Sequence, residues 1–233
     1  MTVTAEQRTY ARLAGITILA HVVLEIGGDS VTIIARGGQS FIENARYAAE
    51  HALLWRGALL SVGASWISIA ILAFALYVVL EPVNKRVAQL ALVLRLGASF
   101  VGAASLMFRV ALTRLYQAAV TESLFTPEQV HTLSGMIQRG ANAGVWTSWI
   151  FMSAGYLLFF VLFLRSRYLP RALAWLGIIG SALLAVATLV MFVFPEGTNW
   201  MKLFGVPGLL AELATALWLL IKGLPRATAD TPA

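Results

Sequence analysis

Long apolar runs separated by short polar connections dominate the pattern along the chain. A bilayer core about 30 Å thick requires about 20 mostly apolar residues in each helical span, and each run comes close to that length or exceeds it. Only helices and closed barrels satisfy their backbone groups in lipid. The pattern therefore predicts an all-α polytopic membrane helix bundle, with transmembrane helices near 13–35, 53–80, 87–116, 137–164, 172–194 and 203–221.

The connections between the runs carry local signals of their own. Residues 43–55 follow a polar, glycine-containing stretch and predict a helical turn at the membrane interface. A threonine before a proline is a favourable helix start, so Thr126-Pro127 predicts a helix that begins ahead of the fourth run. We expect one transmembrane domain over residues 1–225, followed by a short disordered tail at 226–233.

Lysine and arginine are unevenly distributed between the two sets of connections, and this distribution predicts the orientation. One side holds Arg8, Arg12, Lys85, Arg86, Arg165, Arg167, Arg171, Lys222 and Arg226, and the other holds Arg36, Arg46 and Lys202. By the positive-inside rule, both termini are cytoplasmic. The expected location is the bacterial cytoplasmic (inner) membrane.

Composition narrows the possible classes of function. Hydrophobic residues make up 59% of the chain and charged residues 12%, whereas about a quarter of an ordinary soluble domain is charged. The absence of cysteine excludes disulfides, thiolate metal sites and cysteine nucleophiles. The net charge is +6, but the basic residues are scattered over the helix ends. Membrane topology explains this distribution better than nucleic-acid binding does.

Short motifs spread over nearly the whole chain carry a resemblance to a known family. They are Ala11-Arg12-Leu13-Ala14-Gly15, Ala49-Glu50-His51-Ala52-Leu53, Leu80-Glu81-Pro82-Val83-Asn84-Lys85, Tyr168-Leu169-Pro170-Arg171, Ala211-Glu212-Leu213 and the segment 217–223. With these motifs the chain resembles the bacterial six-helix membrane proteins grouped as domain of unknown function 4386. The resemblance implies a fold and no established activity.

Charged residues inside the apolar runs are the most informative polar feature. His21, Glu25 and Asp29 follow i, i+4, i+8 spacing and therefore share one side of the first helix. Arg95 and Arg109 interrupt the third run. Because charge at membrane depth is costly, each such group should face the protein interior, pair with another charge or line a polar cavity.

Helical arithmetic places opposite charges at one level near the outer surface. We therefore expect an outward-facing polar cavity within the bundle. It is formed by carboxylates, arginines and two tryptophans, namely Glu25, Asp29, Arg56, Arg109, Arg139, Trp146, Trp149 and Glu212. Because arginine binds phosphate or carboxylate bidentately, the expected partner besides membrane lipids is a small anionic or lipid-like ligand.

Structural ion pairs are the competing interpretation of the same charges. Glu212 with Arg109, or Asp29 with Arg56, would fix the positions of the helices without any ligand, although the net stability of a buried pair varies because its desolvation opposes its attraction. Near a helix end, Arg114 is expected to extend toward the membrane surface, as long cationic side chains do.

Two active functions are further alternatives. His21 and Glu25 have the spacing to reach one metal ion, with Glu212 as a third ligand, and this pattern is compatible with a metal-dependent intramembrane hydrolase of a lipid-like substrate. Carboxylates beside Gly27-Gly28 are compatible with an ion- or proton-coupled transporter. A small chain would act in transport as a homo-oligomer. The sequence identifies neither a cofactor nor a reaction.

Overall fold

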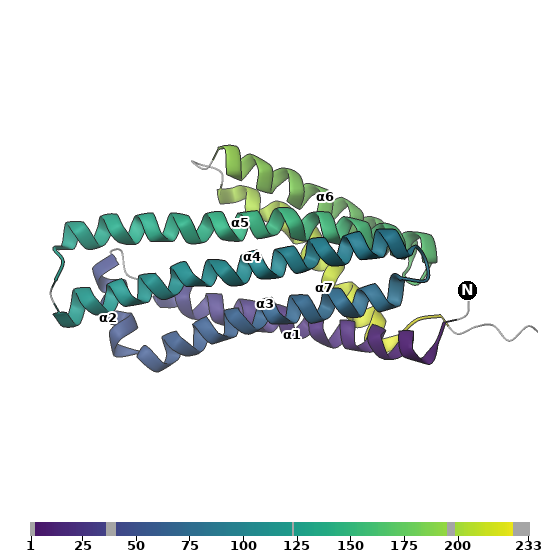
Figure 1. Ribbon diagram of the computed structural model, residues 1–233, viewed down its shortest axis with the longest axis horizontal. Helices are drawn as coiled ribbons and strands as arrows, with labels where there is room; N and C mark the ends of the chain where they lie inside the picture. The colour runs from purple at the N-terminus through teal and green to yellow at the C-terminus, as the bar shows by residue number, and fades with distance from the viewer. Residues whose placement is uncertain (1–2, 36–40, 123, 195–198, 226–233) are drawn as a thin grey trace, which may run out of the picture. The chain divides into compact units, whose positions relative to one another are not determined.

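The computed structural model describes residues 3–35, 41–122, 124–194 and 199–225. Within these residues the chain is helical throughout, with short turns between the helices (Figure 1). In chain order the elements are α1 (Ala5–Ala35), α2 (Phe41–Glu50), α3 (Ala52–Leu80), α4 (Lys85–Gln117), the π-helical turn η1 (Ala118–Glu122), α5 (Pro127–Ser166), α6 (Arg171–Val193), the 3₁₀ helix η2 (Asn199–Gly205) and α7 (Val206–Ile221).

Six helical stretches in the described residues are long and apolar enough to cross a membrane. They are Ala5–Ser30, Ala52–Leu80, Lys85–Val120, Pro127–Ser166, Arg171–Val193 and Trp200–Ile221. The predicted all-α architecture with six spans is confirmed. The short helix α2 occupies most of the segment 43–55, for which the sequence predicted a helical turn. The predicted disordered tail at 226–233 lies outside the described residues, as do residues 36–40 and 195–198.

Two helices begin before their apolar runs because reciprocal capping bonds extend them. At the start of α1, the Gln7 backbone N–H donates to Thr4 Oγ1 over 3.1 Å, and the Thr4 N–H donates to Gln7 Oε1 over 3.0 Å. Thr126 and Gln129 make the same exchange at the start of α5, over 2.9 and 3.3 Å. Such pairs satisfy backbone donors that the first helical turn leaves open. The helix start predicted at Thr126-Pro127 is confirmed.

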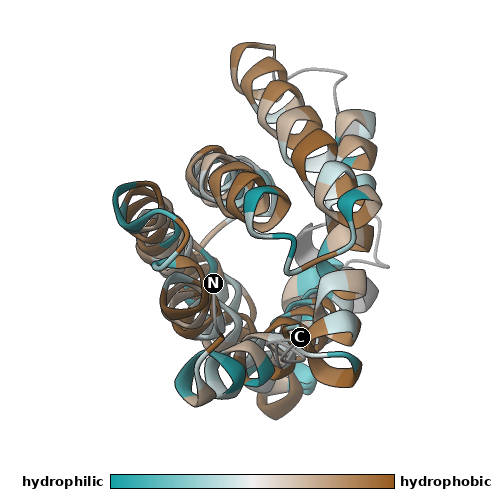
Figure 2. Cartoon of the chain, turned by 90° about the vertical axis from the view of Figure 1, so that its right-hand side faces the viewer, coloured by the Kyte–Doolittle hydropathy of each residue, from teal (hydrophilic) through white to brown (hydrophobic). Residues whose placement is uncertain are grey.

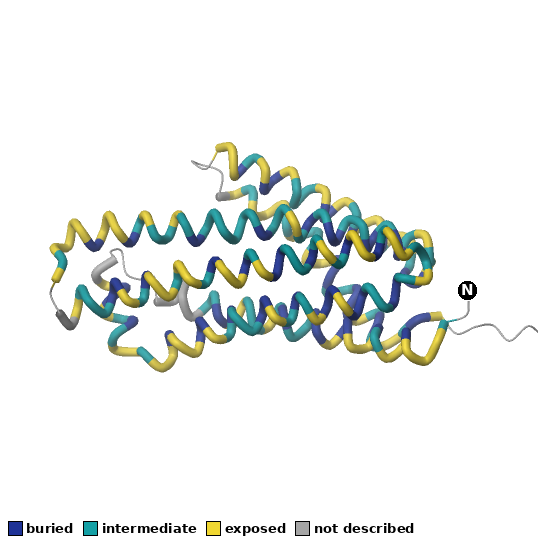
Figure 3. Tube along the Cα trace, in the orientation of Figure 1, coloured by how far each residue is buried: buried dark blue, intermediate teal, exposed yellow. Residues whose placement is uncertain are grey.

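Large apolar side chains are exposed along the helices, as expected for surfaces that meet lipid. Leu53 is 87% exposed, Leu60 76% and Met107 72%. Figure 2 shows hydrophobic residues along the helix lengths, and Figure 3 shows that exposed positions recur from one end of a helix to the other. Soluble monomers rarely expose apolar surface on this scale. These surfaces fit a bilayer environment.

The chain packs as two compact units. Unit 1 is drawn from Met1–Leu19, Ser68–Ala98 and Trp149–Ala233, and unit 2 from Ala20–Ile67 and Ser99–Ser148. The helices α1, α3, α4 and α5 therefore contribute residues to both units. The single domain expected over 1–225 stays a prediction.

Close helix contacts and an apolar core hold unit 1 together. Its fully buried side chains include Ile18, Leu72, Phe159, Phe163 and Leu219. The helices α6 and α7 pack against each other (Figure 1). They approach so closely that a Cβ atom at Gly180 would lie 2.5 Å from the backbone N of Gly208. Small residues permit such approach between membrane helices.

Unit 2 combines a smaller apolar cluster with side-chain hydrogen bonds between helices. Trp55 and Leu112 belong to the buried cluster. The indole N–H of Trp55 donates to Thr113 Oγ1 over 2.9 Å, which joins α3 to α4. Deeper in the same pair of helices, Ser99 donates to the carbonyl of Trp66 over 2.6 Å. These bonds fix the pairing of α3 with α4, on which the candidate site is built.

Candidate functional site

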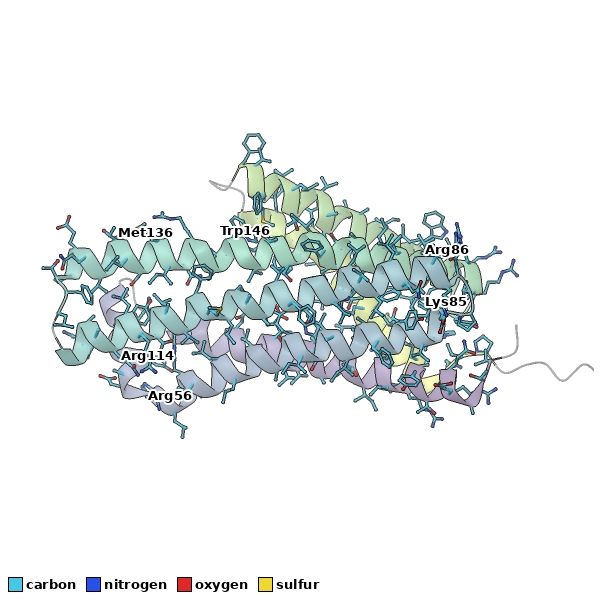
Figure 4. The ribbon with its side chains drawn as sticks, in the orientation of Figure 1. Arg56, Lys85, Arg86, Arg114, Met136 and Trp146 are labelled. Carbon is cyan, nitrogen blue, oxygen red and sulfur yellow. The ribbon has the colours of Figure 1, made fainter. Side chains whose placement is uncertain are left out.

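The residues predicted to line one cavity are divided between the two units. Glu25, Asp29, Arg56, Arg109, Arg139 and Trp146 belong to unit 2, whereas Trp149 and Glu212 belong to unit 1. On α5, Arg139 is exposed and Trp146 is half-buried; Figure 4 labels the tryptophan on this helix. Most of the predicted set therefore lies within unit 2, where Asp29 and Arg109 are brought into direct contact.

Asp29 and Arg109 form an ion pair between α1 and α4. Arg109 Nη1 donates to Asp29 Oδ1 over 2.6 Å, with the two side chains 20% and 39% exposed, respectively. The sequence interpretation had paired Arg109 with Glu212 and Asp29 with Arg56, whereas in the structure the two residues bind each other. Since a carboxylate already neutralises Arg109, this arginine is a weaker candidate for binding an external anion than its charge alone suggests.

The proposed metal pair lies on α1. His21 Nδ1 lies 3.5 Å from Glu25 Oε2, as the i, i+4 spacing predicted. Among the described residues, no group of three or more histidine, aspartate or glutamate side chains is gathered closely enough to hold a metal ion. Structural metal sites in proteins are usually four-coordinate. Metal binding at His21 and Glu25 therefore stays a prediction, and the described residues add no third histidine, aspartate or glutamate ligand to this pair.

An apolar groove with a cationic end runs between α3 and α4 in unit 2. Its volume is about 1000 Å³, and we call it the α3–α4 groove. It is lined by Arg56, Leu59, Leu60, Gly63, Ala64, Ile67, Ala103, Leu106, Val110, Thr113, Arg114 and Gln117. Arg56 lies in the first turns of α3 and Arg114 in the last turn of α4, and Figure 4 labels them at neighbouring helix ends.

The lining of the groove is chemically asymmetric. Leucine, isoleucine, valine and alanine side chains form most of it, and several of them, such as Leu60 and Ile67, are exposed to the surroundings. The two arginines stand at one end, where Arg114 Nη1 also makes a long 3.5 Å contact with Gln117 Oε1. Arg114 was expected only to extend toward the membrane surface, and its position beside Arg56 gives it a partner for binding an anion.

Unit 1 contains a different polar centre, which is closed off from solvent. Arg95 on α4 is fully buried, and its guanidinium carbon lies 3.8 Å from the centroid of the Tyr156 ring on α5. The Tyr156 hydroxyl donates a hydrogen bond to Glu212 on α7. Gly155 leaves room for the arginine, because a Cβ atom there would lie 2.7 Å from Arg95 Cγ. The sequence interpretation named both charges but not the tyrosine that links them.

A family model described as Domain of unknown function (DUF4386) matches residues 13–223. The chain belongs to the DUF4386 family. The resemblance predicted from short motifs is thereby confirmed. No curated protein and no solved structure matches the chain significantly.

The DUF4386 region contains the Asp29–Arg109 pair, the α3–α4 groove and the centre around Arg95. Together with the six span-length helices, this membership makes the chain a helical multi-span membrane protein. The family description carries no activity.

Proposed function

We propose that this DUF4386 protein binds an anionic amphiphile in the α3–α4 groove, with the apolar chain along the groove and the acidic head group at Arg56 and Arg114. The protein does so in the bacterial cytoplasmic membrane with both termini inside, the orientation that the distribution of lysine and arginine favours. In that orientation, Arg56 and Arg114 belong to the outer ends of their helices.

The observation that carries the proposal is the pairing of an apolar groove with two arginines at one end. Lipid tails are as apolar as leucine, so replacing one hydrocarbon chain in the groove by another changes the binding free energy little. Discrimination must then come from the head group. A hydrogen bond to a charged partner contributes about 1.5–3 kcal/mol, and two arginines can contribute more than one such bond.

The access route supports a ligand that arrives from lipid rather than from water. Leu60, Ile67 and Val110 line the groove and are exposed along the helix surfaces that would meet the bilayer. A small polar metabolite would make few apolar contacts with these walls. The structure therefore favours an amphiphile over the small anionic ligand that the sequence interpretation also allowed, and an apolar groove over a polar cavity.

Native mass spectrometry of the detergent-purified protein tests the head-group contact. Phosphatidylglycerol should bind more tightly than phosphatidylcholine with the same acyl chains. The double variant Arg56→Gln/Arg114→Gln should lose this preference, with affinity for phosphatidylglycerol reduced at least about tenfold. The matched control is Arg46→Gln, which removes an exposed arginine of α2 outside the groove lining. Equal binding of both lipids by the wild type would overturn the proposal.

A second pair of variants tests the groove independently of charge. Ala103 lines the groove and Ala104, its neighbour on α4, does not; both are exposed. Ala103→Trp should fill the groove and reduce phosphatidylglycerol retention, whereas Ala104→Trp should retain the lipid as the wild type does. Equal retention by both tryptophan variants would show that the chain lies elsewhere.

A further inference from the structure

A basic pocket lies within unit 1, and its lining shares no residue with the α3–α4 groove. Its volume is about 690 Å³, and we call it the basic pocket. It is lined by the first turns of α1, the turn between α5 and α6, and the end of α7. Four cationic side chains line it, namely Arg8, Arg12, Arg167 and Lys222. The described residues that line it include no carboxylate.

Local structure explains how these cations converge. Arg8 and Arg12 are one helical turn apart and share a face of α1. The helix α5 ends at Ser166, and the next residue, Arg167, has a φ of 58°. A residue in this left-handed region commonly follows the end of a helix, and here it leads the chain into the turn before α6. At the end of α7, Gly223 adopts a φ of 68° and directly follows Lys222.

A buried hydroxyl in the same pocket supplies a second, independent observation. Tyr168 lines the basic pocket and is only 5% exposed. Its hydroxyl has no hydrogen-bond partner among the residues that the structure describes. Buried polar atoms are nearly always hydrogen-bonded, so an open hydroxyl donor on a residue that lines a pocket with four cations points to a ligand that accepts a hydrogen bond.

Membrane topology alone accounts for part of this arrangement. The positive-inside rule explains why cations gather at the cytoplasmic ends of these helices. It does not explain why the neighbouring Tyr168 buries a hydroxyl that has no partner among the described residues. A phosphate group would satisfy this hydroxyl, because its oxygens accept bidentate bonds from arginine and a further bond from a hydroxyl.

We propose that the basic pocket is a phosphate-binding site, in which Arg8, Arg12, Arg167 and Lys222 supply the charge and Tyr168 donates a hydrogen bond. The shared chemistry is a phosphate group, carried by a phospholipid head group of the cytoplasmic leaflet or free in solution. Arg8 and Arg12 precede the residues matched by the DUF4386 family model. The site therefore uses a part of the chain that lies outside the family match.

Thermal unfolding of the full chain in a neutral maltoside detergent tests the proposal with two probes. Inorganic phosphate is titrated against chloride at the same ionic strength, and phosphatidylglycerol is titrated in parallel. Saturable stabilisation by inorganic phosphate identifies a site for soluble phosphate. Stabilisation by phosphatidylglycerol alone, lost in the variants below, identifies a head-group site. Stabilisation by neither probe overturns the proposal.

Matched variants separate a built site from general charge attraction. Arg12→Gln/Arg167→Gln removes two cations of the pocket, whereas Arg165→Gln/Arg171→Gln removes two exposed cations that flank the same turn outside the pocket lining. The first double variant should weaken the response to the active probe at least about tenfold, and the second should retain it. Equal weakening by both would show that net charge alone attracts the anion.

Tyr168→Phe gives the sharpest readout. Because the hydroxyl has no partner among the described residues, its removal should leave the unfolding temperature without phosphate unchanged or higher. The same variant should weaken phosphate binding several-fold. A lower unfolding temperature in the absence of phosphate, with unchanged affinity, would show that the hydroxyl serves the fold and not a ligand. These variants leave Arg56 and Arg114 intact, so failure here is distinguishable from failure of the groove proposal.

Discussion

The guanidinium carbon of Arg95 lies 3.8 Å from the centroid of the Tyr156 ring, and both side chains are buried. The hydroxyl of the same tyrosine donates to Glu212, so one residue of α5 contacts a cation of α4 and an anion of α7. The ring face attracts the cation and the hydroxyl satisfies the carboxylate. This arrangement holds two charges inside unit 1 that would each be costly to bury alone.

Tyr156→Phe should therefore destabilise the protein without disturbing Arg95. The phenyl ring keeps the cation–π contact, but Glu212 loses a buried hydrogen bond, which typically costs about 1–3 kcal/mol. Tyr156→Leu removes the ring contact as well and should cost a further 0.5–2 kcal/mol or so. The free energy of unfolding in detergent measures both, with Tyr10→Phe as a half-buried control. A Tyr156→Phe variant as stable as the wild type would contradict this role.

The Asp29–Arg109 pair predicts energetic coupling between α1 and α4. Asp29→Asn and Arg109→Gln each leave the other charge unpaired, whereas the double variant removes both charges. A double-mutant cycle on the free energy of unfolding should give a coupling of about 0.5–3 kcal/mol. The pair is partly exposed, at 39% and 20%, so a value near the lower end is expected. Strictly additive effects would mean that the contact contributes no stability.

The architecture could be predicted from the sequence because the bilayer limits the options. An apolar run of span length must form a helix in lipid, so six such runs predicted an all-α helix bundle, and six span-length helices are present in the described residues. The first and fourth apolar runs begin at 13 and 137, whereas their helices begin at Ala5 and Pro127; of these two helix starts, only the one at Pro127 was predicted, from Thr126-Pro127. Hydropathy marks only the apolar part of a helix, whereas the capping exchange of Thr4 with Gln7 lengthens α1 into polar sequence.

The site was harder to predict. Helix geometry indicates the face and depth at which a residue lies, but it does not indicate which residue of another helix lies opposite it. That is why Asp29 and Arg109 were each expected to bind a different partner. The pairing of Arg56 with Arg114 depends on the packing of α3 against α4, and nothing local to either arginine indicates it. Tyr156 and Tyr168 were missed because a tyrosine in an apolar run, or beside one, is usually read as packing or as part of an interfacial belt.

The contact between Gly180 and Gly208 predicts a strong penalty for the smallest possible side chain. A Cβ atom at Gly180 would lie 2.5 Å from the Gly208 nitrogen, which belongs to the backbone and cannot rotate away. Gly180→Ala should therefore push α6 from α7 and destabilise the protein by about 1–3 kcal/mol, as overpacking does. Chemical unfolding in detergent measures the loss.

The matched control is Gly57→Ala in α3. A Cβ atom at Gly57 would meet nothing within 4 Å, so the alanine gains helix propensity at no steric cost. Its stability should equal or exceed that of the wild type by up to about 1 kcal/mol. If Gly180→Ala is equally well tolerated, α6 and α7 have more room than the contact implies.

The turn after α3 predicts a dependence of stability on pH. Lys85 Nζ lies 2.8 Å from Glu81 Oε1, and Figure 4 labels the lysine at the start of α4. The hydrogen bond from Lys85, followed by one from Tyr77, lowers the pKa of the Glu81 carboxyl below its ordinary value. A group whose pKa is lowered by folding stabilises the folded state above its unfolded pKa, which is about 4.3 for glutamate. That contribution is lost as the pH falls through the lowered pKa of the folded state.

Glu81→Gln should therefore remove a stability component seen at neutral pH, and its unfolding temperature should converge with that of the wild type as the pH falls below about 4. The difference in unfolding temperature at neutral pH should be small because the Lys85 side chain is 65% exposed, and high salt should reduce this difference further. Thermal unfolding across this pH range, at low and high salt, measures it. The exposed variant Glu128→Gln, at the start of α5, controls for the loss of one carboxylate. Wild-type and Glu81→Gln profiles that run parallel at every pH would rule out a lowered pKa at Glu81 as a source of stability.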